Sequence, residues 1–285
     1  MSVINLQDWV LAETDPARKT FRQAVHLILS AIANSHRLAP LMVMKGGSLL
    51  AIRYNSPRFT KDIDFSTTDV FSKSEVPIFL VDLDEALLTT NADNEYGLRL
   101  RVQSTSLNPQ AEQNPTFPTL RIKIGYAKLS EPNQLKQLNV KKAAQVVSID
   151  YSYNEWSTGI EQQSIDGGQL SMYGLHDLIA EKFRSVLQQV ERQRKRYQDI
   201  YDLFLLLDGH NFSEADKADI LSKLYEASSA RVGIAPSEAS LRDPEVISLS
   251  RADYDTQLPT LLKEPPPAFD ATYQSIRHFY ESLPW

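Results

Sequence analysis

The chain has 285 residues, 42% of them hydrophobic and 23% charged, which is typical of a globular protein with one large or two modest domains. The lack of cysteine excludes disulfides and thiolate metal sites, and the net charge of −6 argues against a general nucleic-acid coat protein. No apolar run approaches the roughly 18 residues of a membrane helix, and the first residues do not resemble a signal peptide, so we expect a cytoplasmic protein with no membrane partner.

The first 153 residues alternate between helical and strand patterns. Apolar residues at helical spacing mark the helices, and period-two alternation marks most of the strands. The prolines of 107–118 predict a loop. In chain order we expect helix 15–35, strand 41–44, helix 48–52, strand 62–66, helix 74–90 and strands 96–105, 119–129 and 144–153.

After about residue 172 the strand patterns stop. The prolines of 229–267 predict an irregular segment. We therefore expect an α/β (α+β) fold in two lobes, with one domain over 1–170 and a helical domain over 171–285. The helices expected in the second domain are 174–191, 195–208, 213–228 and 268–282.

Two carboxylates separated by one residue, Asp62 and Asp64, lie on the apolar strand that contains Ile63 and Phe65. Alternate residues of a strand face the same side, so the two carboxylates should lie together while Ile63 and Phe65 face the core. Like charges this close repel unless a cation lies between them, and Mg²⁺ binds carboxylates together with substrate phosphates. An edge strand with two solvated aspartates is the structural alternative.

Upstream, Gly46, Gly47 and Ser48 stand between a predicted strand and a predicted helix. Glycine lets the backbone approach a ligand, and the N-terminal amides of a helix favour phosphate. The alternative is a tight turn without a ligand. Lys45 before it either contacts a phosphate or is exposed.

Asp150 is a third acidic candidate, on the polar face of the strand 144–153. If that strand lies beside the Asp62 strand, three carboxylates converge. Asp150 could then share a metal ion or activate an attacking hydroxyl. An ordinary outward-facing aspartate is the alternative.

In the second half, Lys182 lies within the apolar arc of its predicted helix. Lysine rarely occupies a buried stripe without a partner or an anionic ligand, although a snorkelling lysine is the alternative. Asp199 flanks the core face of the next helix and could pair with Lys182, whereas Asp202 reads more readily as a surface carboxylate. The basic run 192–196 is either a solvated surface or a place for an RNA backbone.

Taken in order, four blocks of sequence resemble the AbiEii/AbiGii-type nucleotidyltransferase toxins, to which the MenT-type toxins are related, within the polymerase-beta-like nucleotidyltransferase superfamily. The match is good over about 40–66 and 174–207. The blocks are Lys45-Gly46-Gly47-Ser48, Arg58-Phe59-Thr60-Lys61-Asp62-Ile63-Asp64-Phe65, Leu178-Ile179-Ala180-Glu181-Lys182 and Asp199-Ile200-Tyr201-Asp202-Leu203.

The resemblance implies a nucleotidyltransferase core with a mixed sheet, a helical lobe, and an active site in the cleft. It implies that Ser48 holds the triphosphate, that Asp62 and Asp64 bind Mg²⁺, that Lys182 contacts nucleotide phosphates and that Asp199 completes the site. The third metal ligand is assigned to Asp150, because the strand 121–125 offers no carboxylate. The other nucleotide-binding candidates are Lys45, Gly46, Gly47 and Arg58.

The resemblance also implies a toxin of a type IV-like toxin–antitoxin or abortive-infection system that serves in phage defence. It would transfer NMP from an NTP to an acceptor such as the 3′ end of tRNA, and would have a cognate antitoxin. Two alternatives remain open: an NTP-binding regulatory module without turnover, and a protein phosphotransferase of the same fold.

Overall fold

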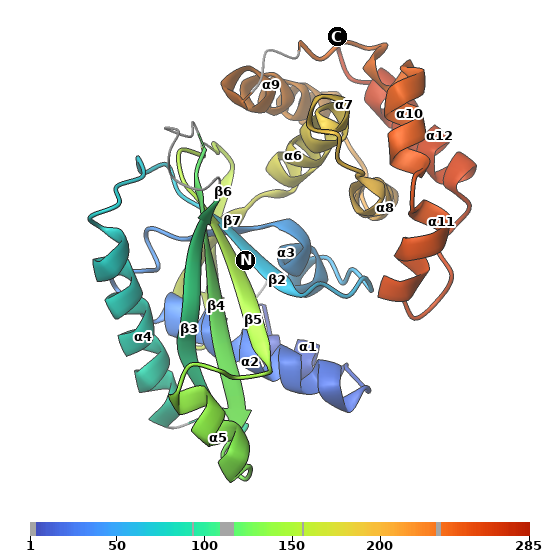
Figure 1. The fold of residues 1–285 in the computed structure, drawn as a ribbon. Coiled ribbons are helices and arrows are strands. Elements are labelled where there is room, and N and C mark those ends of the chain that lie inside the picture. Colours follow the sequence, from blue (N-terminus) through green and yellow to red (C-terminus); the bar gives the residue numbers. More distant parts are fainter. Residues whose placement is uncertain (1–3, 93, 109–116, 156, 232–234) are drawn as a thin grey trace. The chain divides into compact units, whose positions relative to one another are not determined.

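The computed structural model describes residues 4–92, 94–108, 117–155, 157–231 and 235–285. The chain forms two compact units (Figure 1). Unit 1 takes the described residues within 1–53, 61–156 and 160–172, and unit 2 takes 54–60, 157–159 and those within 173–285. Two short segments that interrupt unit 1 in the sequence therefore belong to unit 2.

Unit 1 contains a mixed seven-stranded sheet in the order β3-β4-β5-β2-β1-β7-β6, and so has the predicted α/β character. β2 lies parallel to β5 and antiparallel to β1, while β1 also pairs in parallel with β7. The strands are β1 Val43–Lys45, β2 Asp62–Ser66, β3 Leu98–Asn108, β4 Thr119–Lys128, β5 Val146–Ser152, β6 Ile160–Ile165 and β7 Gly168–Tyr173.

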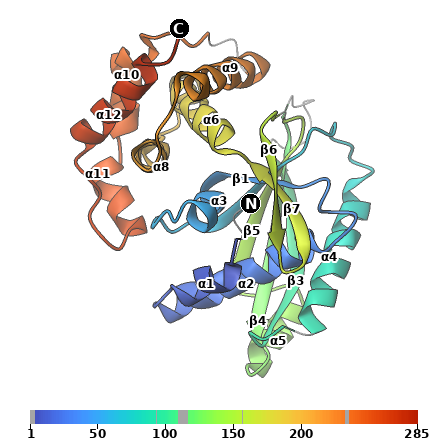
Figure 2. The same ribbon diagram turned by 180° about the vertical axis from the view of Figure 1, so that it is seen from behind.

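Two helices of unit 1, α1 and α2, begin at a residue whose side chain caps them. In α2 the Asp15 side chain accepts a hydrogen bond from the Arg18 N–H, and Pro16 occupies the first turn, so both N-terminal signals are present. α2 packs beside α4, and α4 also covers β3, as both views show (Figure 1, Figure 2). These helices are α1 Leu6–Leu11, α2 Pro16–Ala33, α3 Gly46–Arg53, α4 Val76–Ala92 and α5 Pro132–Asn139.

Four elements of unit 1 were not among the predicted ones: α1, α5, β6 and β7. β6 has a weak apolar pattern because much of it is polar, with the sequence Ile-Glu-Gln-Gln-Ser-Ile. Its hairpin turn to β7 nevertheless carries a clear signal. Asp166 and Gly167 both have positive φ, 47° and 85°, which is the conformation that an Asp-Gly pair favours in two-residue hairpins.

Unit 2 is helical, and its core forms where apolar faces of α6, α8, α9 and α12 meet. Phe183 of α6, for example, packs on Tyr280 and Phe279 of α12. The helices are α6 Leu175–Leu187, α7 Gln189–Arg192, α8 Tyr197–Asp208, α9 Glu214–Arg231, α10 Pro244–Arg251, α11 Tyr254–Gln257 and α12 Phe269–Glu281, with 3₁₀ turns at Ser240–Arg242 and Leu258–Leu261.

The prediction that 229–267 is irregular was wrong, because α10 and α11 lie within it. Two of the prolines, Pro244 and Pro259, lie in the first turn of a helical segment. Asp243 caps α10 by accepting from the Glu245 N–H, and Pro244 occupies its first turn. Likewise, the expected loop 107–118 begins later than predicted, since β3 continues to Asn108, and 109–116 lie outside the described residues. In the described part of the chain no helix is long and apolar enough to cross a membrane.

Candidate active site

Four charged residues form one row across the sheet of unit 1. In the strand register Lys45 of β1 lies opposite Asp64 of β2, Asp64 opposite Asp150 of β5, and Asp150 opposite Arg121 of β4. Directly paired residues of neighbouring strands share a face. The row therefore carries two carboxylates at its centre and a cation at each end.

The two carboxylates of β2 lie on the face opposite the core. Ile63 and Phe65 are completely buried, whereas Asp62 and Asp64 between them are half-buried. The predicted alternation is thus confirmed. Burial of the two apolar side chains fixes the direction of both carboxylates, because a one-residue shift of the strand would expose Phe65.

α3 begins directly against this pair of carboxylates. Gly46 has a φ of +71°, and a Cβ at this position would lie 2.0 Å from Oδ2 of Asp64. Only glycine fits both the left-handed backbone and the close approach. The Ser48 hydroxyl is buried and donates a hydrogen bond of 2.6 Å to the carbonyl of Asp62, so α3 is tied to the start of β2.

Of the two environments expected for Lys45, a phosphate contact or an exposed surface, the structure excludes the exposed surface. Its side chain is buried, and its ammonium group pairs with the buried carboxylate of Glu155. Glu155 follows β5, so this ion pair joins the two strands that flank β2. Sequence reasoning missed Glu155, and the only available signal was a lysine inside a buried strand, which needs a charge partner.

Asp150 lies beside Asp64, as the pairing of β2 with β5 requires, but its carboxylate is held by Arg121. Nε and Nη2 of Arg121 each donate to one carboxylate oxygen at 2.7 Å. The hydrogen bond and charge of Asp150, with smaller contributions from Asp62 and Asp64, raise the pKa of Arg121. Among the described residues, no three histidine or carboxylate side chains gather in a group that could hold a metal ion.

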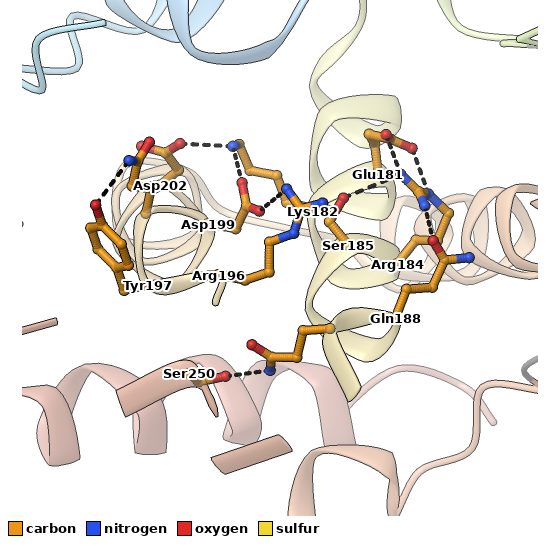
Figure 3. A network of polar contacts seen from close by, with 12 residues as sticks. Glu181, Lys182, Arg184, Ser185, Gln188, Arg196, Tyr197, Asp199, Asp202 and Ser250 are labelled. Carbon is orange, nitrogen blue, oxygen red and sulfur yellow. Dashed lines mark hydrogen bonds and ion pairs between the residues drawn. The ribbon is translucent and has the colours of Figure 1, made fainter. Parts of the chain in front are cut away.

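In unit 2, Lys182 of α6 lies between two carboxylates of α8 (Figure 3). Its ammonium donates to Asp199 at 2.9 Å and to Asp202 at 2.7 Å. Asp202 also receives Nε and Nη2 of Arg58, at 2.9 and 2.8 Å. Arg58 comes from the segment 54–60, and its Nη1 donates to Gln198 at 2.8 Å.

The electrostatics of this cluster favour the fully charged state. Burial raises the pKa of Asp202, but Arg58 and Lys182 outweigh this effect and lower it to about 2. Burial lowers the pKa of Lys182, and the charges of Asp199 and Asp202 reverse this and leave it raised. Arg58 and Lys182 face Asp199 and Asp202, and Arg196 lies 3.4 Å from Asp199, so each buried charge is compensated.

The structure thus distributes the predicted site residues over both units. Unit 1 holds Lys45, Gly46, Gly47, Ser48, Asp62, Asp64 and Asp150, and unit 2 holds Arg58, Lys182 and Asp199. Asp202 was interpreted as a surface carboxylate, yet it is completely buried and binds both cations of its cluster. The sequence signal for its burial was its spacing of three residues from Asp199, because this spacing directs both side chains toward α6.

Comparison with protein families places these features in a known context. Residues 27–275 match the model of the family described as nucleotidyl transferase AbiEii toxin, type IV TA system. The match includes both the β2 carboxylates and the Lys182 cluster. A search of the curated proteins finds no match.

Solved structures of similar fold include two proteins from Helicobacter pylori. JHP933 is 15% identical, with a TM-score of 0.55 over 95% of this chain and 93% of the other. A "putative nucleotidyltransferase" is 13% identical, with a TM-score of 0.52 over 95% of this chain and 96% of the other. At these identities the similarity establishes the α/β fold over nearly the full length.

Proposed function

Since the chain belongs to the AbiEii nucleotidyltransferase toxin family, we propose that it is a Mg²⁺-dependent toxin that transfers NMP from an NTP to the 3′ end of tRNA. The observation that carries this proposal is the contact of the Gly46 backbone with the Asp64 carboxylate at the start of α3. It joins a helix N-terminus, which favours phosphate, to a carboxylate pair, which favours a divalent cation.

The donor set of unit 1 fits a magnesium ion. Asp62 and Asp64 present two half-buried carboxylates on one face of β2, and Mg²⁺ commonly uses one or two carboxylates together with substrate phosphates. In this proposal Asp62 and Asp64 hold the ion. When bound, it would neutralise charge on the α-phosphate and on the pyrophosphate leaving group.

The start of α3 would bind the nucleotide phosphates. The backbone N–H groups of Gly46, Gly47 and Ser48 lie in the first turn, where no intrahelical acceptor exists for them. The Ser48 hydroxyl donates to Asp62 and retains acceptor capacity only, so we assign it to holding this turn against β2 and leave the triphosphate contact to its N–H.

From unit 2 we propose that Lys182 supplies a further phosphate contact. Asp199 and Asp202 account for two of its three N–H donors and hold the ammonium in place. Arg58, engaged with Asp202 and Gln198, would secure Asp202 and so act through Lys182. Such fixed charges stabilise a phosphoryl transition state without reorganisation.

Asp150 would be the third acidic residue of the site. Because Arg121 already binds both of its oxygens, Asp150 can serve as a base or a metal ligand only if this ion pair opens. A cytoplasmic location and a cognate antitoxin complete the proposal, as the family description implies a toxin–antitoxin system.

The test is the fate of labelled phosphate. The protein is incubated with Mg²⁺, total tRNA and each of the four NTPs, labelled at either the α- or the γ-phosphate. Nucleotidyl transfer predicts that α-label enters the tRNA and that Asp64→Ala abolishes both the labelling and toxicity in cells. Transfer of γ-label instead would identify a phosphotransferase, and tight NTP binding in calorimetry without any transfer would identify a regulatory module.

A further inference from the structure

A row of polar residues runs along one face of α6 and α7 in unit 2. The helical hydrogen bonds continue across the junction of these helices: the Gln188 N–H donates to Arg184 and the Arg192 N–H donates to Gln188, at 3.0 and 3.1 Å. Arg184, Gln188 and Arg192 therefore succeed one another at intervals of four residues, on the same face. Arg184 and Gln188 are buried and Arg192 is exposed, so the row leads from the interior to the surface.

The inner end of this row has a hydrogen-bond donor without an acceptor. The Gln188 side chain is 2% exposed; its Oε1 accepts from Nη1 of Arg184, and its Nε2 has no partner among the described residues (Figure 3). Because a guanidinium only donates, this contact fixes the amide with its NH₂ group directed away from Arg184. A buried donor of this kind calls for an acceptor that the described residues do not supply.

The outer end of the row is positively charged and only partly neutralised. Glu181 pairs with Arg184, Asp253 with Lys195, and Asp199 with Arg196. In the described part of the chain, no ion pair involves Arg192 or Arg194, and both are exposed. Burial, and then repulsion by Arg184, Arg194 and Arg196, lower the pKa of Arg192, against a smaller opposing effect of Glu181.

The backbone holds the two exposed arginines at the end of the helix. Gln193 has a φ of 48°, its N–H donates to Val190, and the Arg194 N–H donates to Gln189 at 3.0 Å. This pair of hydrogen bonds is the Schellman motif, which satisfies the terminal carbonyls of α7. Arg192 and Arg194 are thus placed on either side of a fixed turn, and the terminal carbonyls need no hydrogen bonds from their guanidinium groups.

We propose that Gln188, Arg192 and Arg194 bind a phosphate group, with Arg184 orienting the Gln188 amide. Amide and guanidinium donors together match the several acceptor oxygens of a phosphate. A nucleotide and an RNA backbone both offer this group. We assign the bound phosphate to the backbone of the RNA acceptor. This choice of ligand rests on the proposed function.

The experiment measures binding of a short fluorescein-labelled single-stranded RNA by anisotropy, over a series of salt concentrations, without Mg²⁺ or NTP. Arg192→Gln and Arg194→Gln change exposed side chains and should leave the fold intact. Each should weaken binding about tenfold and reduce the slope of log K against log salt by about one. Arg277→Gln on α12 removes the same charge from the same unit and should leave both quantities unchanged.

A parallel calorimetric titration with NTP distinguishes the two sources of phosphate. If Arg192→Gln weakens NTP binding and leaves RNA binding unchanged, the site binds phosphate as proposed, but its ligand is the nucleotide rather than RNA. If all three variants bind RNA with the same affinity and NTP with the same affinity, the proposed phosphate site is wrong. Since no transfer occurs in these conditions, the outcome is independent of whether the wild-type protein labels tRNA, which tests the proposed function separately.

Discussion

At the scale of single residues, Gly46 is the position where the backbone most tightly constrains the site. Gly46→Ala should displace Asp64, because the new Cβ would lie 2.0 Å from its Oδ2. We expect α-label transfer to fall by a factor of about 100 or more, in line with the loss of a positioned catalytic group. Label transfer and the urea midpoint of unfolding are the measurements.

Gly97→Ala is the matched control for this substitution. Gly97 has a similar φ of +61°, but nothing lies within 4 Å of a Cβ built there. The control therefore carries the strain of a left-handed alanine, roughly 1 kcal/mol, without a collision. If label transfer fell by the same factor in both variants, the contact between Gly46 and Asp64 would make no contribution to catalysis.

Asp202 should make stability depend on pH in the acidic range. Its pKa is about 2 in the folded protein and about 3.8 ordinarily, so the folded state favours the carboxylate. The resulting stabilisation, on the order of 2 kcal/mol, is present above pH 4 and is lost as the pH falls toward 2. Urea unfolding of wild type and Asp202→Asn at pH 5 and pH 3 checks this: the difference between the two proteins should shrink at pH 3, and a constant difference would contradict it.

The residue-scale part of the site was only partly predictable from the sequence. The alternation in β2 placed Asp62 and Asp64 correctly, because a period of two follows from the backbone alone. The partners of Lys45, Asp150 and Asp202 come from segments distant in the sequence. Glu155, Arg121 and Arg58 could not be identified as these partners before strand pairing and helix packing were known.

At the scale of elements, the pairing of β4 with β5 determines the charge next to Asp64. Arg121→Gln should leave Asp150 and Asp64 as adjacent like charges on paired strands, which costs about 0.2–1 kcal/mol. We expect a lower melting temperature in EDTA than for wild type, and a larger rise on addition of Mg²⁺. Thermal melts with and without Mg²⁺ measure both effects.

Arg99→Gln on β3 serves as the control for this comparison. Arg99 is exposed, and its cross-strand neighbour is Ala127 rather than a carboxylate. Its removal should change the melting temperature in EDTA and in Mg²⁺ equally. A Mg²⁺ response of Arg121→Gln no larger than that of Arg99→Gln would show that Asp150 takes no part in binding the ion.

The elements themselves were predicted well where they are long and periodic, as in α2, α6 and β5, since burial of one face imposes the period on the sequence. β6 was missed because it is an edge strand with few apolar residues. α10 was missed because prolines were taken as breakers, although Pro244 occupies the first turn of this helix, where proline is tolerated.

At the scale of the whole molecule, each unit is built from segments that are not consecutive in the sequence. A fragment of residues 171–285 would lack Arg58, and also Ser157 and Gly159, which bind the buried Asp177 at 2.7 and 3.2 Å. Loss of Arg58 breaks its buried ion pair with Asp202, which costs about 3–5 kcal/mol. We expect the fragment to unfold at low urea concentration or without cooperativity, as followed by circular dichroism.

Full-length Arg58→Gln separates the contribution of this ion pair from that of the missing chain. It should be destabilised while remaining cooperatively folded, because the contacts of 157–159 are retained. A fragment as stable as the full-length variant would mean that segment 54–60 contributes only Arg58 to unit 2, and that 157–159 contribute nothing.

By itself, the sequence determined the helices and strands with strong periodicity, the α/β character, the face of β2 that bears the carboxylates, and the family. These follow from local backbone geometry and from motifs that are contiguous in the chain. Only the tertiary structure decided that Arg121 holds Asp150, that Glu155 neutralises Lys45 and that Asp202 is the centre of a buried ion cluster. Compensation of a buried charge depends on which groups meet in space, and residues up to 144 positions apart supply them here.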